Sequence, residues 1–157
     1  MASFLRIHPS IRAALAANKP IVALESTIIT HGLPWPANLK TALEIEQTVC
    51  DQGAVPATTA FIDGKAYVGL DEKQIERLAE TGKKATKTSR RDVAGILAAG
   101  KDSVGATTVS GTMLLAHLAG IQIFGTGGIG GVHRGGENSL DVSADLTELS
   151  RTPVAVF

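Results

Sequence analysis

The sequence predicts an α/β protein built in three layers (α/β/α), in which helices cover both faces of a largely parallel central sheet. Short apolar segments alternate along the 157 residues with longer segments of amphipathic, helical pattern. That alternation is typical of parallel strands joined by crossover helices. Hydrophobic residues make up 44% of the chain, which is enough for a packed core, and the length fits one domain.

Seven short segments are expected to be strands, because each is apolar or β-branched and is bounded by turn residues. In chain order they are residues 21–24, 57–62, 66–69, 85–88, 103–109, 121–124 and 154–157. The second and third are separated by Asp63 and Gly64, a dipeptide that favours a hairpin turn. These two strands are therefore expected to form a hairpin.

Six segments have a helical pattern of apolar residues, namely residues 9–18, 36–52, 71–80, 89–99, 111–119 and 144–150. Pro9 suits the first turn of the first helix. Asp71 and Ser89 stand at the starts of the third and fourth helices, where their side chains can cap free N–H groups. Gly53 and Gly120 follow the ends of two others, as helix-stop residues do.

Charge and cysteine content narrow the class of protein. Fifteen basic residues balance fifteen acidic ones, so the chain lacks a basic footprint and no nucleic-acid partner is expected. No apolar run reaches the 18 residues of a membrane span, and no secretory signal is seen, so no membrane partner is expected. The chain has a single cysteine, Cys50, so it cannot form an internal disulfide, which favours a reducing, cytoplasmic location. The helical, apolar surroundings of Cys50 favour a core thiol over the alternative, a nucleophile.

Residues 125–136 read GTGGIGGVHRGG, and seven of these twelve residues are glycine. Interior glycines destabilise helices and strands, so this glycine-rich loop must turn sharply or bring its backbone close to a ligand. A phosphate cradle of backbone N–H groups is one interpretation, and a structural turn is another. A dinucleotide fingerprint, with Asp145 about 20 residues after the first glycine, is a third. It is disfavoured because further glycines follow where a helix should begin.

Other candidate residues stand where predicted strands end, and ligands bind at the carboxyl ends of parallel strands. Glu25 follows an apolar strand, where burial would disfavour its charged form and suit a general acid; a solvated or capping Glu is the alternative. Lys87 could bind phosphate, form a Schiff base or be solvated. Asp141 and Asp145 are four residues apart, so on a helix they would share a face. Their carboxylates could then be ligands of Mg²⁺ or Mn²⁺; a helix cap at Asp141 or Ser143 is the alternative. His133 could act as a general base.

Five segments occur together in an order that resembles one known family. They are ALESTIITHGLP at 23–34, TKTSRRD at 86–92, GATTV at 105–109, FGTGGIGGVHRG at 124–135 and DVSADL at 141–146. The chain resembles the pseudouridine-5′-phosphate glycosidase (pseudouridylate synthase) family from about residue 5 to residue 157. The resemblance implies an α/β/α fold, a homotrimer, manganese (Mn²⁺) as the metal, and reversible cleavage of pseudouridine 5′-phosphate to uracil and ribose 5-phosphate. The bond that is broken is a C–C glycosidic bond.

The resemblance also implies roles for single residues. Glu25 is similar to the family's proton donor, and Asp141 is similar to its metal ligand. Positions that bind or contact the substrate in the family are matched here by Lys87, Val109, Thr126, His133, Ser143, Ala144 and Asp145.

The family's Schiff-base lysine follows the strand that corresponds to residues 154–157, and family members are longer than this chain. Residues 1–157 are therefore expected to be the N-terminal part of a single glycosidase domain, with a truncated sheet. On this expectation the isolated chain has little or no activity. A non-catalytic fragment that binds ribose phosphate is the alternative.

Overall fold

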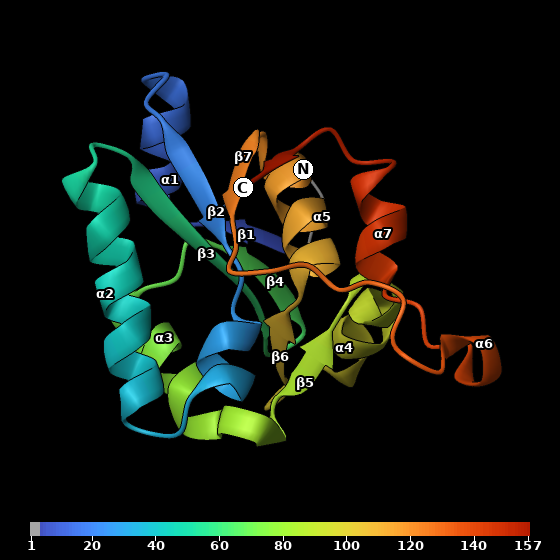
Figure 1. Ribbon diagram of the computed structural model, residues 1–157. Helices are drawn as coiled ribbons and strands as arrows, with labels where there is room; N and C mark the ends of the chain where they lie inside the picture. The colour runs from blue at the N-terminus through green and yellow to red at the C-terminus, as the bar shows by residue number, and fades with distance from the viewer. Residues whose placement is uncertain (1–3) are drawn as a thin grey trace.

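The computed structural model describes residues 4–157 and shows a central sheet with helices on both faces (Figure 1). Its strands run in the hydrogen-bonded order β1-β4-β3-β2-β7-β8, while β6 joins through β3 and carries β5 at its other edge. The strands are β1 Leu5–Ile7, β2 Ile21–Leu24, β3 Val55–Ile62, β4 Lys65–Val68, β5 Thr86–Thr88, β6 Val104–Thr107, β7 Ile123–Gly125 and β8 Ala155–Val156. The predicted three-layer α/β class is confirmed.

The sheet is mostly parallel, as predicted, but β3 runs against two of its neighbours. Among residues 4–157, five strand pairs are parallel, whereas β3–β4 and β3–β6 are antiparallel. The first of these is the predicted hairpin: Asp63 and Gly64 have φ of 52° and 69°, as a type I′ turn requires. β3 pairs with β2 through residues 55–58 and with β6 through residues 60–62, so the sheet branches there.

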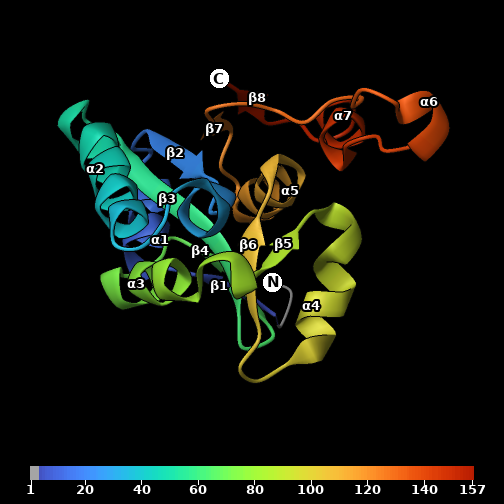
Figure 2. The same cartoon turned by 60° about the horizontal axis from the view of Figure 1, so that its bottom comes forward.

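Each face of the sheet carries its own hydrophobic core. Alternate side chains of β3 supply both, with Ala57 and Phe61 in one core and Ala60 and Ile62 in the other, as the two-residue period of a strand requires. Figure 2 shows α2 and α3 on one side of the sheet and α5 on the other. Helices α1 (Pro9–Ala16) and α5 (Val109–Ala119) pack into the first core, and α2 (Ala37–Asp51) and α3 (Glu72–Thr81) into the second.

The predicted helices are present, with ends shifted by a few residues. Asp71 caps α3 as predicted, because its side chain accepts the N–H of Gln74 while the Gln74 side chain accepts the N–H of Asp71. Ser89 caps a 3₁₀ turn, Arg90–Asp92, that leads into α4 (Val93–Ala99). Of the helices in the described part of the chain, none is long and apolar enough to cross a membrane.

Some features differ from the sequence predictions. The pattern of residues predicts neither β1, nor the π-helical turn Ile28–Gly32, nor the four-residue α6 (Gly136–Ser139). β1 is short and owes its strand form to parallel pairing with β4, a distant partner that a local pattern does not reveal. Cys50 is exposed near the end of α2, so its prediction as a core thiol is wrong.

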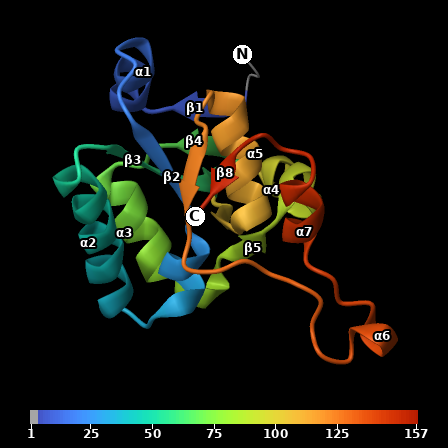
Figure 3. The ribbon, with the colours of Figure 1, turned by 45° about the horizontal axis from the view of Figure 1, so that its top comes forward.

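The carboxyl ends of β2 and β6 meet head to head at the middle of β3. Leu24 lies opposite Thr58 on β3, and Ala106 approaches from the other direction opposite Ala60. The strand ends thus converge as expected. The convergence has two sources: β2 and β6 run toward each other along β3, and β2 and β7 run side by side in parallel. In Figure 3 the chain leaves β7, runs out to α6 and returns to α7 (Ala144–Leu149).

Candidate functional site

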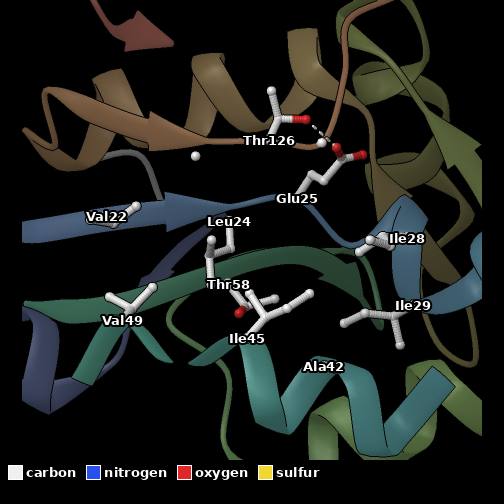
Figure 4. Close-up of a pocket in the computed structure, with 12 residues that line it drawn as sticks. Val22, Leu24, Glu25, Ile28, Ile29, Ala42, Ile45, Val49, Thr58 and Thr126 are labelled. Atoms are coloured by element: carbon white, nitrogen blue, oxygen red, sulfur yellow. Dashed lines mark hydrogen bonds between the residues drawn. The ribbon is translucent and has the colours of Figure 1, made fainter. Parts of the chain in front are cut away.

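Glu25 is the first residue beyond β2 and is half-buried. Thr126, the first residue beyond β7, donates a hydrogen bond of 2.5 Å from Oγ1 to Glu25 Oε1, and Thr27 Oγ1 donates to Oε2. Figure 4 shows the Thr126 hydroxyl directed at this carboxylate. Because both carboxylate oxygens accept hydroxyl donors, the side chain is held in one orientation.

Buried hydroxyl groups lock the strand ends next to Glu25. The N–H of Thr107 donates to Ser26 Oγ at 2.9 Å, and the N–H of Ser26 lies 3.3 Å from the Thr107 carbonyl oxygen. Thr107 Oγ1 also lies 2.8 Å from Thr59 Oγ1 on β3. All three side chains are fully buried. These bonds join β2, β3 and β6 and fix the backbone from which Glu25 projects.

A cavity of about 200 Å³ opens beside Glu25, and we call it the polar pocket. It is lined by Glu25, Thr27, Lys87, Ser89, Thr108, Val109, Gly128, Gly130, His133, Ser143 and Asp145. Six predicted site residues therefore share one pocket, and Thr126 contacts Glu25 directly. Ala144 and Asp141 are not among the lining residues. Thr27, Ser89 and Thr108 also line the pocket. The sequence places each of them in a polar cluster at a predicted strand end, but gives none of them a role in the site.

Asp145 is buried at 6% exposure in the wall of this pocket. Its Oδ1 accepts the N–H of Ser110 and its Oδ2 accepts the N–H of Gly130, both at 2.9 Å. One N–H of the glycine-rich loop, that of Gly130, is thus taken by the protein's own carboxylate. A phosphate cradle formed by the rest of the loop stays a prediction. No helix begins at Gly130, since the next one is α6. The loop therefore lacks the geometry of a dinucleotide fingerprint.

Asp141 lies between α6 and α7, so it does not share a helix face with Asp145 as the spacing of the two residues suggested. Its Oδ2 is 3.2 Å from Nδ1 of His133, and both side chains are more than half exposed. A carboxylate is a donor that suits Mn²⁺, and an imidazole is a common metal ligand in proteins. Within residues 4–157 there is no group of three or more His, Cys, Asp or Glu side chains that could enclose a metal. A divalent ion here would need water or ligand oxygens as further donors.

Lys87 projects from β5 into the polar pocket and is exposed. The positive charge of Lys87 also affects His31. Burial lowers the pKa of the His31 imidazole, and the ammonium groups of Lys87 and Lys83 lower that pKa further. Lys87 therefore brings one positive charge to a pocket that is also lined by the Glu25 and Asp145 side chains.

A second cavity, of about 280 Å³, is also lined by Glu25 (Figure 4). It is mainly apolar and is lined by Val22, Leu24, Glu25, Ile28, Ile29, Ala42, Ile45, Val49, Thr58, Gly125, Thr126 and Gly127. Thr58 donates a hydrogen bond of 2.5 Å to Glu46 from this region. Burial raises the pKa of Glu46, and the Thr58 hydrogen bond opposes that rise.

The fold and the polar pocket define an α/β protein with a small-molecule site where its strand ends converge. The family model described as "Indigoidine synthase A like protein" matches residues 10–157, and the chain belongs to this family. A pseudouridine-5′-phosphate glycosidase of Hahella chejuensis is 57% identical over 157 residues, which are 100% of this chain and 51% of that protein. The protein of the same name from Escherichia coli is 57% identical over 152 residues, 97% of this chain and 48% of its own. The chain spans about half the length of these curated relatives.

Two solved structures share the fold. The prealnumycin C-glycosynthase AlnA, crystallised with ribulose 5-phosphate, matches 99% of this chain and 49% of its own with a TM-score of 0.86 and 46% identity. An indigoidine synthase A-like protein of Thermotoga maritima matches 94% of this chain and 46% of its own with a TM-score of 0.79 and 33% identity.

Proposed function

We propose that this chain carries the proton-donor and phosphate side of a C-glycosidase site for pseudouridine 5′-phosphate, which yields uracil and ribose 5-phosphate. The observation that carries the proposal is that Glu25, held by two hydroxyl donors, shares one pocket with Lys87. Relatives named for this activity are 57% identical to the chain, and the AlnA structure holds a sugar phosphate.

The chemistry requires a proton at carbon. Net addition of water across the C–C glycosidic bond places a hydrogen on the uracil carbon that leaves and oxygen on the sugar carbon. Glu25 is placed to give that hydrogen as a general acid. The Lys87 ammonium supplies a point charge for the phosphate of the substrate. The glycine-rich loop closes the pocket, while its Gly130 N–H is already committed to Asp145.

Manganese fits the outer part of the site. Asp141 would hold the ion with His133 as a second donor, because their side chains already face each other at 3.2 Å. When bound, Mn²⁺ would supply positive charge for oxygen atoms of the sugar phosphate. A homotrimer of the full-length protein stays a prediction from the resemblance, which sedimentation of a full-length protein tests. A cytoplasmic location stays a prediction from the single cysteine, which cell fractionation tests.

Titration calorimetry with ribose 5-phosphate tests the proposal, and Lys84 offers a matched control because it is exposed and does not line the polar pocket. The wild type and K84A should bind with equal affinity. K87A should bind at least about tenfold more weakly, since a charge-assisted hydrogen bond is lost. Equal affinity of K87A and wild type would contradict the assignment of Lys87, and a folded wild type that does not bind would contradict the proposed site.

A further inference from the structure

Asp145 is a buried carboxylate whose two oxygens are both engaged by backbone. Ser110 donates to Oδ1 from the first turn of the eleven-residue helix α5, and Gly130 donates to Oδ2 from the glycine-rich loop. N–H groups in a first helical turn have no partner within the helix, and the helix dipole favours an anion there. The carboxylate thus joins two segments that are far apart in the sequence.

The loop side of this contact leaves no room for a side chain. A Cβ on Gly130 would lie 2.7 Å from the Cβ of Ser143 and 2.9 Å from Oδ2 of Asp145. Ser143 Oγ in turn accepts the N–H of Asp145 at 3.2 Å. The loop backbone is therefore seated against the start of α7, and the contact with Asp145 fixes its position at Gly130.

Residues 126–130 connect this contact to Glu25. At their start, Thr126 accepts the N–H of Gly128 at 3.3 Å on the same oxygen that donates to Glu25. Gly127, Gly128 and Ile129 are exposed, so side-chain packing does not hold the middle of the segment. The segment is held at its two ends. At one end Thr126 donates from Oγ1 to Glu25 and from its N–H to the Phe157 carbonyl oxygen. At the other end Gly130 donates to Asp145, and the Ser143 N–H donates to the Gly131 carbonyl oxygen.

We propose that Asp145 is a positioning residue that clamps Gly130 to α5 and so keeps the Thr126 hydroxyl on the Glu25 carboxylate. The inference rests on the proposed function, in which Glu25 donates the proton. It gives Asp145 a role through the loop in addition to the substrate contact that the resemblance implies for this pocket-lining residue.

Nuclear magnetic resonance of the 157-residue chain without substrate tests the clamp. D145N keeps the side-chain shape but places an NH₂ group against one of the two N–H donors. Amide hydrogen exchange at Gly130 or Ser110 should then become at least about tenfold faster. The Glu25 side-chain carboxyl resonance should move in D145N as it moves in T126V, and the double variant should move no further than T126V alone. D51N, which removes an exposed carboxylate at the end of α2, should change neither readout.

If D145N lowers stability yet leaves the Glu25 resonance in place, Asp145 is only structural and the proposal is overturned. Additive shifts in the double variant would overturn it as well, because the two residues would then act separately. Should D145N not fold, G130A displaces the same contact and should move the Glu25 resonance, whereas G131A, with open space at its Cβ, should not. None of these readouts needs substrate, so a folded chain that fails to bind ribose 5-phosphate would count against the proposed function and not against the clamp.

Discussion

Glu25 and Thr126 lie 101 positions apart in the sequence, yet Thr126 Oγ1 donates a 2.5 Å hydrogen bond to Glu25 Oε1. The contact follows from the sheet, because β2 and β7 pair in parallel with Leu24 opposite Gly125. Each of the two residues is the first beyond its strand. The proposed proton donor is therefore oriented by strand register, and the glycine-rich loop begins at the residue that orients it.

Gly130 should not tolerate a methyl group. In G130A the new Cβ would meet Ser143 Cβ at 2.7 Å, and since backbone must move to relieve this, we expect a loss of about 1–3 kcal/mol in the free energy of unfolding. Chemical denaturation measures the change. G131A is the matched control, because nothing lies within 4 Å of its Cβ position, and it should stay within about 0.5 kcal/mol of wild type. Equal stability of the two variants would argue against the close approach at Gly130.

Removing the charge of Lys87 should raise the pKa of His31 toward its ordinary value of 6.5, because the Lys87 ammonium is one of the groups that lower it. Burial and Lys83 still act in K87M, so the pKa should stay below 6.5. A titration of the His31 imidazole followed by nuclear magnetic resonance gives the value. K84M should leave it unchanged. An unchanged His31 pKa in K87M would place the Lys87 charge away from the His31 imidazole.

Glu46 should destabilise the fold as the pH rises. Burial raises its pKa above the ordinary value of 4.5, so its contribution to stability is fully present below pH 4.5 and is lost as the pH rises through the raised pKa. E46Q keeps an oxygen for the Thr58 hydroxyl and removes the ionisation. Its stability relative to wild type should therefore increase from pH 4 toward pH 7 in urea denaturation. E44Q, at an exposed position of the same helix, is the control, and a pH-independent difference for E46Q would contradict the assignment.

The contribution of Asp63 to stability should fall as the pH falls, which is the opposite of the pH dependence expected for Glu46. Two hydrogen bonds of 2.9 Å from Arg77 lower the pKa of Asp63 below the ordinary value of 3.8. Its contribution is present above pH 3.8 and is lost as the pH falls through the lowered pKa. Because both side chains are more than a third exposed, we expect D63N to cost no more than about 1 kcal/mol at pH 7. Asn tolerates the positive φ at this position. E44Q, which breaks the more exposed 3.7 Å pair with Lys40, should cost less; the reverse order would contradict the interpretation.

Local signals were enough to predict much of the fold. The strand at residues 21–24, the hairpin at Asp63 and Gly64, and the cap at Asp71 each depend on a few adjacent residues, and the structure contains all three. The placing of Glu25 at the end of an apolar strand was equally visible. Short-range chemistry of this kind is read directly from residue types and spacing.

Contacts between residues that are far apart in the sequence could not be predicted from such local patterns. Nothing near β3 indicates that β2 and β6 meet head to head along it. The carboxylate of Asp145 could be seen as a ligand or a cap, but its donors lie 35 and 15 residues away, and only the folded chain shows that both oxygens are used. The polar pocket was predicted from the residues that line it, whereas the way in which they are held in place was not.

Uracil release from pseudouridine 5′-phosphate tests the central claim most directly, with residues 1–157 joined to the half of the Escherichia coli relative that this chain does not match. We predict that this chimaera releases uracil in the presence of Mn²⁺, that E44Q leaves the rate unchanged, and that E25Q lowers it by about 10²–10⁴-fold, the usual contribution of a general acid. A folded chimaera whose E25Q variant releases uracil as fast as the parent would contradict the account.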